Sequence, residues 1–495
     1  MRAVELLQAV RYEPAGEKIR FPDREISGVS IDSRDCREGS VFVCIRGSVC
    51  NGSRYAKEAV RHGAKVLVAA KEEQELIGKI LGQFPECEGV LVEDEREAAA
   101  LLAARYEGEP SRSMTMIGVT GTKGKTTTVS MIRKILSEAG IRTGMIGTTG
   151  QFDGKEHLPS EHTTPDAVTL QRSLARMRKN ACRACVMEVS SQALKLQRTK
   201  GICFDTGVFL NLGDDHIGRF EHADKEEYLA CKRKLFLQSR EAVVNADDPA
   251  WKQMLAGTEC PFQTFGIRNG DFRAEQIRTE GFVQGHPGVE FDIGEVHFQI
   301  PAPGIFTVYN ALAAVRVCMQ YGVTPKTAAG SLLDFQVKGR MQFFSIPGGG
   351  EAVIDYAHNA MSLESVLTTL RAYRPARLIT VFGCGGQRAK ERRFQMGEVS
   401  GRLSDLTVIT SDNPRWEAPE AIMDDIETGV RKTDGKYLRI TDRKEAVKQA
   451  VEMAGPGDLV VIAGKGHENT QEIQGVFYRM DEQELVEEAC TQKLL

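Results

Sequence analysis

Apolar, β-branched runs alternate with longer amphipathic segments along the chain. In the first hundred residues, "KVLVAA" (65–70) and "GVLVED" (89–94) have the composition of buried strands, and "REAAALLAARY" (96–106) has that of a helix. Further on, the apolar run "TMIGV" (115–119) precedes a segment whose apolar residues recur at helical spacing. This alternation predicts an α/β fold with mostly parallel sheets.

The pattern falls into three regions. The polar segment "EGEPSRS" (107–113) indicates a linker, and the pattern starts again near "DFQVKGRMQ". We therefore expect an N-terminal domain over 1–110, a central domain with a P-loop-type, mostly parallel sheet over 111–337, and a Rossmann-like C-terminal domain over 338–495. A GxGxxG fingerprint is absent, so NAD is not indicated.

The expected strands of the second and third regions run directly into polar, glycine-rich loops. Ligands of open α/β sheets bind at the carboxyl ends of the strands. If these two domains face one another, their loops would form a cleft in which a nucleotide and a second substrate meet.

The composition narrows the class of protein. With 41% hydrophobic and 27% charged residues, the chain is typical of soluble globular proteins. The net charge of −4 favours neither nucleic acid nor an anionic membrane as a partner, and no apolar run reaches membrane-spanning length. Twelve scattered cysteines and the lack of a secretion signal predict a cytoplasmic location. The one C-x-x-C, Cys182 and Cys185, has no second pair at zinc-ribbon spacing, so a zinc or redox role is not indicated for it.

The segment "GVTGTKGKTT" (118–127) has the features of a phosphate-binding loop, although its first glycine is one place off the usual pattern. Gly121 and Gly124 let the backbone approach phosphate oxygens, and the helix start directs N–H groups at an anion. Lys125 is expected to contact the β- and γ-phosphates, and Thr126 to bind Mg²⁺. The alternative is an ordinary glycine-rich turn. The predicted nucleotide loop comprises Gly121, Thr122, Lys123, Gly124, Lys125, Thr126 and Thr127.

Further motifs follow in a fixed order. They are "TTPD" (163–166), "MEVSSQAL" (187–194), "YLACKRKLF" (228–236), "NADDP" (245–249), "DYAHNAMSL" (355–363), "SDNPR" (411–415) and "GKGHE" (464–468). With the offset loop and the opening "GVSIDSRDCREGSVFVCIRG", they resemble the Mur ligase family over almost the whole chain, and most closely its MurE branch. The resemblance implies an ATP-dependent amide ligase of peptidoglycan biosynthesis, which adds meso-diaminopimelate to UDP-N-acetylmuramoyl-L-alanyl-D-glutamate through an acyl phosphate.

The resemblance also implies a catalytic and metal-binding set. Thr126 and Glu188 would hold one Mg²⁺, and His216 would help to hold a second. Lys232 would be carried as N6-carboxylysine, a carbamate that ligates metal, and would act with Lys125, Glu188 and His216. Judged from the residues alone, His216 is equally well a solvated loop histidine, and Lys232 is a lysine on a solvated helix face.

Substrate contacts are implied at three groups of positions. For the UDP-linked substrate they are Ser33, Thr163, Thr164, Ser190 and Arg198; for adenosine they are Asn310, Arg340 and Asp355; for diaminopimelate they are Arg388, Asp412, Asn413, Pro414, Arg415, Gly464 and Glu468. Arg415 would grip the distal carboxylate with two hydrogen bonds, and Glu468 would accept from the distal ammonium. L-lysine would leave Arg415 without an anionic partner.

Three other interpretations stay open. Departures from the common family pattern, among them Gln192, Gln387 and Phe394, allow a MurE-like paralogue that adds L-lysine or another amine. Folylpolyglutamate synthetase also joins glutamate through ATP, but the uridine-type opening argues against it. A catalytically weak nucleotide-binding partner is opposed by the retained catalytic residues. The expected partners are small-molecule substrates, and a monomer is expected.

Overall fold

The computed structural model describes residues 1–16, 19–47, 50–213, 218 and 222–494. The chain divides into two compact units. One unit comprises Met1–Arg273 and Tyr309–Thr327, and the other comprises Ala274–Val308 and Ala328–Leu495. The domain boundaries expected after residues 110 and 337 stay predictions.

The first hundred residues form the N-terminal sheet. Its strand order is β1 (Glu13–Pro14), β5 (Glu88–Val92), β4 (Ala64–Ala70), β3 (Ser40–Val43) and β2 (Gly28–Ser30). All neighbouring pairs are parallel except β1 with β5. The accompanying helices are α1 (Ala3–Leu7), α2 (Ala56–Arg61), α3 (Gln74–Gln83) and α4 (Glu95–Tyr106), with 3₁₀ turns at Ser33–Asp35, Gly52–Tyr55, Lys71–Glu73 and Pro110–Ser113.

The central sheet follows in the same unit. Its strand order is β14 (Phe272–Arg273), β13 (Phe262–Gly266), β12 (Ser239–Asn245), β11 (Phe204–Phe209), β6 (Thr115–Thr120), β10 (Ala184–Glu188), β7 (Thr143–Gly147), β8 (Gly150–Phe152) and β9 (His157–Leu158). The strands from β14 to β7 are parallel, and the β7–β8 and β8–β9 pairs are antiparallel. The inner parallel strands, such as β6 and β10, are buried on both faces, which explains their continuous apolar runs.

Several helices follow the strands of the central sheet along the chain. They are α5 (Lys125–Glu138), α6 (Ala167–Lys179), α7 (Ser191–Lys195), α8 (Lys225–Leu237) and α9 (Trp251–Met254). Two more helices, α10 (Ile305–Met319) and α11 (Pro325–Leu332), contribute residues to both units.

The second unit contains an antiparallel ribbon and the C-terminal sheet. The ribbon consists of β15 (Glu275–Val283), β16 (His286–Ile293) and β17 (Val296–Ile300). The C-terminal sheet has the order β18 (Gln342–Ile346), β19 (Gly350–Asp355), β23 (Leu459–Ala463), β20 (Leu378–Phe382), β21 (Leu406–Ile409) and β22 (Tyr437–Arg439). Only β18 is antiparallel to its neighbour. A short hairpin, β24 (Thr470–Ile473) and β25 (Val476–Arg479), follows β23.

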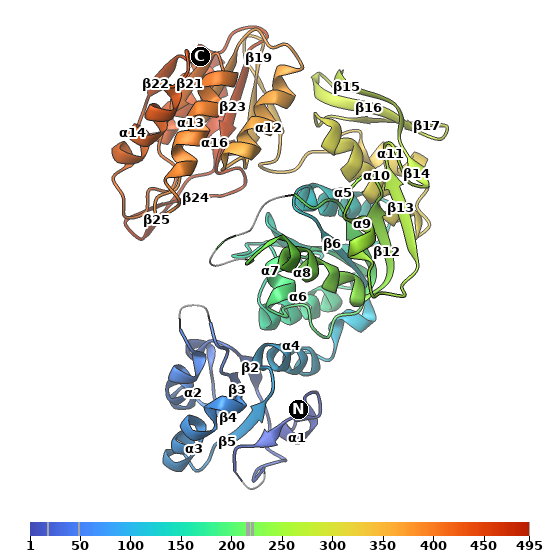
Figure 1. Cartoon of the computed structure of the whole chain (residues 1–495), viewed down its shortest axis with the longest axis vertical. Coiled ribbons are helices and arrows are strands. Elements are labelled where there is room, and N and C mark those ends of the chain that lie inside the picture. Colours follow the sequence, from blue (N-terminus) through green and yellow to red (C-terminus); the bar gives the residue numbers. More distant parts are fainter. Residues whose placement is uncertain (17–18, 48–49, 214–217, 219–221, 495) are drawn as a thin grey trace. The chain divides into compact units, whose positions relative to one another are not determined.

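Helices cover both faces of the C-terminal sheet (Figure 1). One core contains residues of α12 (Ala360–Arg371), α13 (Glu391–Leu403) and α14 (Pro419–Val430), together with strand residues such as Val353 and Val461. The other contains residues of α15 (Arg443–Met453) and α16 (Glu482–Leu494), together with Ile354 and Ile462. Successive strand residues thus enter opposite cores, as the two-residue period of a strand requires.

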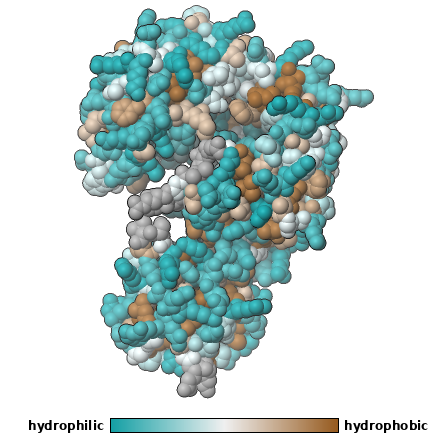
Figure 2. Space-filling view, in the orientation of Figure 1, coloured by the Kyte–Doolittle hydropathy of each residue, from teal (hydrophilic) through white to brown (hydrophobic). Residues whose placement is uncertain are grey.

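The expectation of an α/β fold with parallel-rich sheets is confirmed by this architecture. The face of the molecule in Figure 2 is mostly hydrophilic, with small hydrophobic patches between hydrophilic residues. Among the described residues, no helix combines the length and the apolar composition needed to cross a bilayer.

Candidate functional site

The predicted nucleotide loop lies where the chain order of the central sheet reverses. Strand β6 leads into the loop and then, through α5, to β7, while β10 and β11 pair with β6 on its two sides. The carboxyl ends of β10 and β11 therefore flank the loop; Glu188 is the last residue of β10, and Asn211 lies shortly after β11. Such a switch point is where open α/β sheets bind their ligands.

Gly124 makes the entry into α5 possible. Its φ of 85° lies in the left-handed region, and a Cβ at this position would collide with Oδ1 of Asn310. Asn310 also accepts a hydrogen bond from the Thr128 hydroxyl at 3.2 Å. This residue, predicted to contact adenosine, thus packs directly against the loop.

Asn211 fixes the loop from the neighbouring strand. Its Oδ1 accepts the backbone N–H groups of Thr122 at 3.1 Å and Lys123 at 2.9 Å, and its Nδ2 donates to the Lys123 carbonyl at 3.2 Å. The sequence analysis did not single out this residue. Its position directly after a buried strand is the signal that could have found it.

Two lysines meet at one carbonyl oxygen of the loop. Lys125 Nζ donates to the Gly121 carbonyl at 2.8 Å and to the Thr122 carbonyl at 3.1 Å. Lys232 Nζ, from α8, donates to the same Gly121 carbonyl at 2.9 Å and lies 4.6 Å from the centre of the Tyr228 ring. Lys232 is only 1% exposed, so the alternative of a solvated helix lysine is wrong.

Glu188 occupies the carboxyl end of β10 as a buried acid. Its carboxylate accepts the Thr148 backbone N–H at 2.8 Å and the Thr148 hydroxyl at 3.2 Å. Gly147 lies against it, because a Cβ at Gly147 would collide with Oε1 of Glu188. The carboxylate is therefore held in one orientation beside the loop.

The residues predicted to hold Mg²⁺ fit a hard cation. Thr126 offers a hydroxyl from the first turn of α5, and Glu188 offers a carboxylate from the adjacent strand end. Lys232 reaches the same loop, but an ammonium has no acceptor atom and would ligate only as a carbamate. His216, the fourth predicted ligand, lies outside the described residues.

Four residues predicted to bind the UDP-linked substrate lie together at the carboxyl end of β10. The Thr164 hydroxyl donates to the Glu188 carbonyl at 2.8 Å and accepts the Ser190 N–H at 3.1 Å. Arg198 donates to the Thr164 carbonyl at 2.7 Å, and burial lowers the pKa of its guanidinium. The Thr163 hydroxyl lies 3.0 Å from that of Thr148.

Ser33, the fifth residue predicted for that substrate, belongs to the N-terminal sheet region. It is buried in the turn after β2, and its hydroxyl donates to the Glu58 carboxylate at 3.1 Å. Ser33 is therefore not one of the residues that the structure gathers at the carboxyl end of β10.

Two loops at the carboxyl ends of β21 and β23 form the predicted amino-acid site. Asn413 Nδ2 donates to Glu468 at 3.0 Å, and the buried Lys465 donates to both, to Asn413 Oδ1 at 3.1 Å and to Glu468 at 3.0 Å. Lys465 was not predicted, although it stands inside the GKGHE motif. It gives Glu468 a cationic partner within the chain.

Arg415 also has an anionic partner within the chain. Its Nε donates to Glu472 at 3.0 Å, and its Nη1 donates to the Gly386 carbonyl at 2.7 Å. Its φ of 55° is left-handed, which is uncommon for a residue with a side chain. The expectation that lysine would leave Arg415 without an anionic partner is therefore wrong, because Glu472 pairs with it before any substrate is present.

The remaining predicted amino-acid contacts surround this pair of loops. Gly464 has a φ of 114°, and a Cβ there would lie 2.8 Å from Asp412 Oδ2. Pro414 precedes Arg415. Its carbonyl oxygen lies so close to Gly386 that a Cβ at Gly386 would collide with it. Arg388, the last of them, is exposed.

Arg340 and Asp355, predicted for adenosine, adjoin one another in the second unit. The Asp355 carboxylate accepts the N–H groups of Met341 and Ala357, each at 2.9 Å. The Arg340 guanidinium lies 4.5 Å from the centre of the Tyr356 ring. The structure thus brings these two residues together beside β19.

A buried ion pair that the sequence did not reveal supports the amino-acid loops. Arg443 Nε donates to Glu482 at 2.7 Å, and the guanidinium also donates to the carbonyls of Ser411 at 3.2 Å and Ala463 at 2.9 Å. Both side chains are fully buried. Burial raises the pKa of Glu482 to about 7. The pair ties the ends of β21 and β23 together.

Asp247, in the NADDP motif, holds another loop in place. Its carboxylate accepts the N–H groups of Ile267 at 2.6 Å, Arg268 at 2.9 Å and Asn269 at 2.7 Å, and the Tyr309 hydroxyl at 2.9 Å. The motif predicted no role for this residue. Its contacts join the end of β13 to α10.

Comparison with known proteins assigns the family. Three family models match: "Mur ligase family, catalytic domain" over residues 25–107, "Mur ligase middle domain" over 119–318, and "Mur ligase, glutamate ligase domain" over 339–466. A UDP-N-acetylmuramoyl-L-alanyl-D-glutamate--2,6-diaminopimelate ligase of Syntrophomonas wolfei is 37% identical over 100% of both chains. The ligase of the same name from Clostridium botulinum is 36% identical over 95% of this chain and 96% of its own.

The chain belongs to the Mur ligase family. A solved structure of a UDP-N-acetylmuramoyl-L-alanyl-D-glutamate--2,6-diaminopimelate ligase is 28% identical to this Mur ligase, covers 100% of both chains and has a TM-score of 0.68. MurF of Thermotoga maritima, solved in complex with ADP, shares the fold with a TM-score of 0.60 at 20% identity, over 94% of this chain and 97% of its own. The family resemblance and the three-domain Mur ligase architecture expected from the motifs are thereby confirmed.

Proposed function

We propose that this Mur ligase joins meso-2,6-diaminopimelate to UDP-N-acetylmuramoyl-L-alanyl-D-glutamate in peptidoglycan biosynthesis, with ATP as the source of activation. Its full-length relatives carry the name of this reaction. The observation that carries the choice of amino acid is the pair of loops at the ends of β21 and β23. One loop contributes Arg415, and its Asn413 donates to Glu468 of the other. A guanidinium and a carboxylate suit the two charges at the distal end of diaminopimelate.

The nucleotide loop supplies the first half of the reaction. The D-glutamate carboxylate attacks the γ-phosphorus of ATP, the bond to the β-phosphate oxygen breaks, and an acyl phosphate and ADP result. Lys125 exchanges the carbonyls of Gly121 and Thr122 for phosphate oxygens, and the first turn of α5 donates N–H groups to them. Catalysis of this kind consists mostly of positioning and charge stabilisation.

The second half is attack of the amine on the acyl carbon. The amine nitrogen forms the amide bond, phosphate leaves, and the amine releases a proton to solvent. Thr164 and Ser190 stand at the end of β10 next to Glu188, and Arg198 supports their loop. We assign these residues to the UDP-linked substrate, and Asn310, Arg340 and Asp355 to adenosine.

Mg²⁺, when bound, would neutralise the negative charge that gathers on the transferring phosphoryl group. Thr126 and Glu188 are the oxygen donors that we assign to it. We further propose that Lys232 carries a carbamate. Two ammonium groups on the Gly121 carbonyl repel one another, and a carbamate would replace that repulsion with attraction to Lys125.

L-lysine is the second candidate for the added amino acid. The observation that favours it is the Arg415–Glu472 ion pair, which neutralises the guanidinium without a distal substrate carboxylate. The second candidate differs from the first only in the amino acid that is added. The nucleotide loop and the residues at the carboxyl end of β10 would have the same roles in both reactions.

The cell compartment follows from the substrates and the thiols. We propose a cytoplasmic location, because the UDP-linked substrate and ATP are cytoplasmic metabolites. All twelve cysteines lie among the described residues, and each is a free thiol, which agrees with a reducing compartment.

The test is phosphate release from ATP in the presence of UDP-N-acetylmuramoyl-L-alanyl-D-glutamate and a panel of amino acids. Meso-diaminopimelate should give the highest kcat/KM, and release should require both the amino acid and the UDP-linked substrate. Equal or better use of L-lysine would replace the first candidate with the second. Release with neither amino acid would refute the proposal of a ligase for this substrate.

A further inference from the structure

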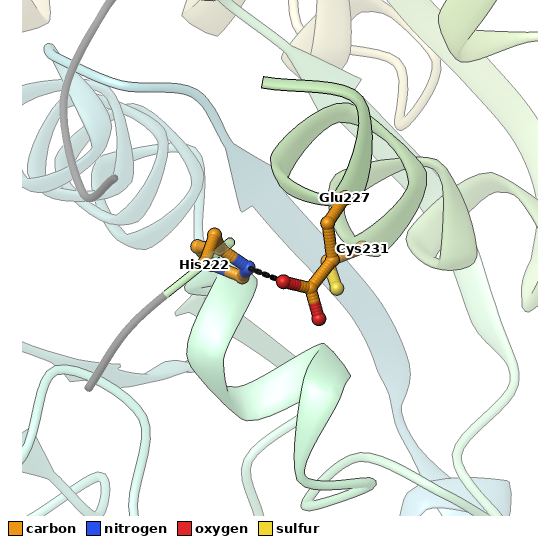
Figure 3. Close-up of side chains that lie close together, drawn as sticks. All are labelled: His222, Glu227 and Cys231. Carbon is orange, nitrogen blue, oxygen red and sulfur yellow. Dashed lines mark ion pairs between the residues drawn. The ribbon is translucent and has the colours of Figure 1, made fainter. Parts of the chain in front are cut away.

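Three potential metal ligands that the ligase reaction does not use converge at the start of α8. They are His222, Glu227 and Cys231, and their ligand atoms all lie within 4.8 Å of one another. Figure 3 shows the His222 ring directing a nitrogen at the Glu227 carboxylate, with Cys231 beside it on the same helix. His222 Nδ1 and Glu227 Oε2 are 3.9 Å apart.

The local sequence places these groups together. Glu227 and Cys231 are four residues apart on α8, so they project from one face of the helix. Asp224 caps the helix by accepting the Glu227 N–H at 2.8 Å, which fixes where α8 begins. His222 lies just before this cap, so its ring lies over the first turn of α8.

His222 is oriented as a ligating histidine is. Its Nε2 lies 2.9 Å from the Ser191 hydroxyl, and the ring is buried to 1% exposure. When Nε2 carries the proton and donates to Ser191, Nδ1 presents a lone pair to the Glu227 side. Ligating histidines are held in this way by a partner on the other ring nitrogen.

We propose that His222 Nδ1, Glu227 Oε2 and the Cys231 thiolate form a binding site for Zn²⁺, with a fourth position left to water. The mixed nitrogen, oxygen and sulfur donors suit Zn²⁺ and not Mg²⁺, which prefers oxygen. Ligand atoms around one Zn²⁺ lie ~3–4 Å apart. The present spacing of up to 4.8 Å therefore requires only a small closure of the three side chains.

Two existing contacts of Glu227 compete with the cation. Its Oε1 pairs with Lys195 at 2.7 Å, and its Oε2 accepts the Ala223 N–H at 2.7 Å. A carboxylate oxygen has two lone pairs, so Oε2 can keep the Ala223 bond and still ligate. Lys195 has a side chain that is 34% exposed, so its ammonium can turn toward solvent.

Binding would release a proton. The Cys231 thiol loses its proton to solvent as the Zn–S bond forms, so affinity rises with pH. Glu227, with a side chain 33% exposed, provides the way in from solvent.

The site also touches the nucleotide loop through one side chain. The His222 ring packs 5.1 Å from the Tyr228 ring, and the Tyr228 hydroxyl lies 3.1 Å from the Thr122 hydroxyl. For this reason the test measures metal binding directly on the full chain without substrates. Its result does not depend on the proposed ligase reaction.

The experiment is titration of the metal-free, reduced protein with Co²⁺, followed by displacement with Zn²⁺. Wild type should bind one equivalent with a thiolate-to-cobalt charge-transfer band in the near ultraviolet, and Zn²⁺ should abolish the band. Cys231→Ser should lose the band, whereas Cys260→Ser, a matched change of a partly buried thiol, should keep it. A wild-type protein without the band, or a band that persists in Cys231→Ser, would overturn the proposal.

A second variant covers the case in which Cys231→Ser does not fold. Ser191→Ala removes the partner of His222 Nε2 and leaves all three ligands, so it should retain the band and weaken binding about tenfold. Thermal unfolding checks that each variant is folded. Unchanged affinity in a folded Ser191→Ala protein, together with unchanged affinity in Glu227→Gln, would also overturn the site.

Discussion

Lys125 and Lys232 donate to the same oxygen, the carbonyl of Gly121, at 2.8 and 2.9 Å. They come from different helices, α5 and α8, and they meet at the loop that precedes α5. One lysine belongs to the motif that predicted the nucleotide site, and the other was assigned only by family resemblance. Their convergence brings the second lysine to the predicted nucleotide loop. A separate prediction follows for each lysine.

Lys125→Ala should leave the fold intact, because its side chain contacts loop carbonyls and not the core. Loss of a charge that stabilises the transferring phosphoryl group should lower kcat by ~10²–10³, or about 3–4 kcal/mol. Phosphate release checks the rate, and thermal unfolding checks the fold. Lys134→Ala, which changes a partly exposed lysine of the same helix that pairs with Glu138, is the control and should retain activity. Turnover of Lys125→Ala within threefold of wild type would contradict the assignment.

Lys232→Ala tests the carbamate. Activity should be very low without an additive and should be partly restored by short carboxylates, which can occupy the place of the carbamate oxygens. Lys234→Ala, two residues further along α8, should keep full activity and show no response to the additive. Full activity of Lys232→Ala without a carboxylate would rule out the role.

Gly147→Ala tests the position of Glu188. The added methyl group would collide with Glu188 Oε1, so the carboxylate must move away from the nucleotide loop. We expect a folded protein that is destabilised by ~1–3 kcal/mol and requires more Mg²⁺ for half-maximal activity. Gly82→Ala is the control, because a Cβ at this position of α3 meets open space. It should raise the stability of the protein or leave it unchanged, and it should not affect the Mg²⁺ requirement. An unchanged Mg²⁺ requirement in Gly147→Ala would show that Glu188 does not serve the metal.

Asp247→Asn should remove the part of the folding stability that depends on the ionised Asp247 carboxylate. Desolvation alone would raise the pKa of Asp247, but the backbone N–H groups of Arg268 and Ile267 outweigh it and lower the pKa to about 2. A lowered folded-state pKa adds stability above the unfolded value near 3.8, and that stability is lost as the pH falls through about 2. Chemical denaturation between pH 2 and pH 6 should show a shallower pH dependence for the variant, with ~1–2 kcal/mol lost at pH 6.

A parallel pH dependence in the two proteins would contradict this role of Asp247. Tyr309→Phe removes one donor and keeps the three backbone donors, so it should retain most of the wild-type pH dependence.

The sequence predicted the elements of this fold better than the partners within its sites. Strands such as β6 and β23 are buried on both faces, so their apolar runs are unbroken and easily recognised. Motif order then placed Lys125, Glu188 and Arg415 at strand or helix ends. The Lys232 contact with Gly121 and the Arg443–Glu482 pair join segments distant in sequence, and no local period or spacing encodes such pairs.

The ion pair of Arg415 with Glu472 gives the last prediction, which concerns the choice of amino acid. Glu472 holds Arg415 Nε, while Nη1 contacts the Gly386 carbonyl. A distal carboxylate would therefore meet a guanidinium that is fixed in place and already partly neutralised. Arg415→Ala should remove the preference for meso-diaminopimelate over L-lysine and leave the KM for ATP unchanged. Side-by-side kcat/KM values for the two amino acids measure this.

Two variants of Glu472 separate the positioning of Arg415 from the neutralisation of its charge. In Glu472→Gln, the side-chain oxygen still accepts from Arg415 Nε, but the negative charge is gone. The guanidinium then attracts the substrate carboxylate more strongly, and the preference for meso-diaminopimelate should rise by roughly fivefold, or ~1 kcal/mol for a partly exposed ion pair. Glu472→Ala removes the acceptor as well, so the guanidinium loses its orientation and the preference should fall. Because the two changes are expected to act in opposite directions, a common direction would refute this account of Glu472, and an unchanged preference in Arg415→Ala would show that Arg415 does not read the distal carboxylate.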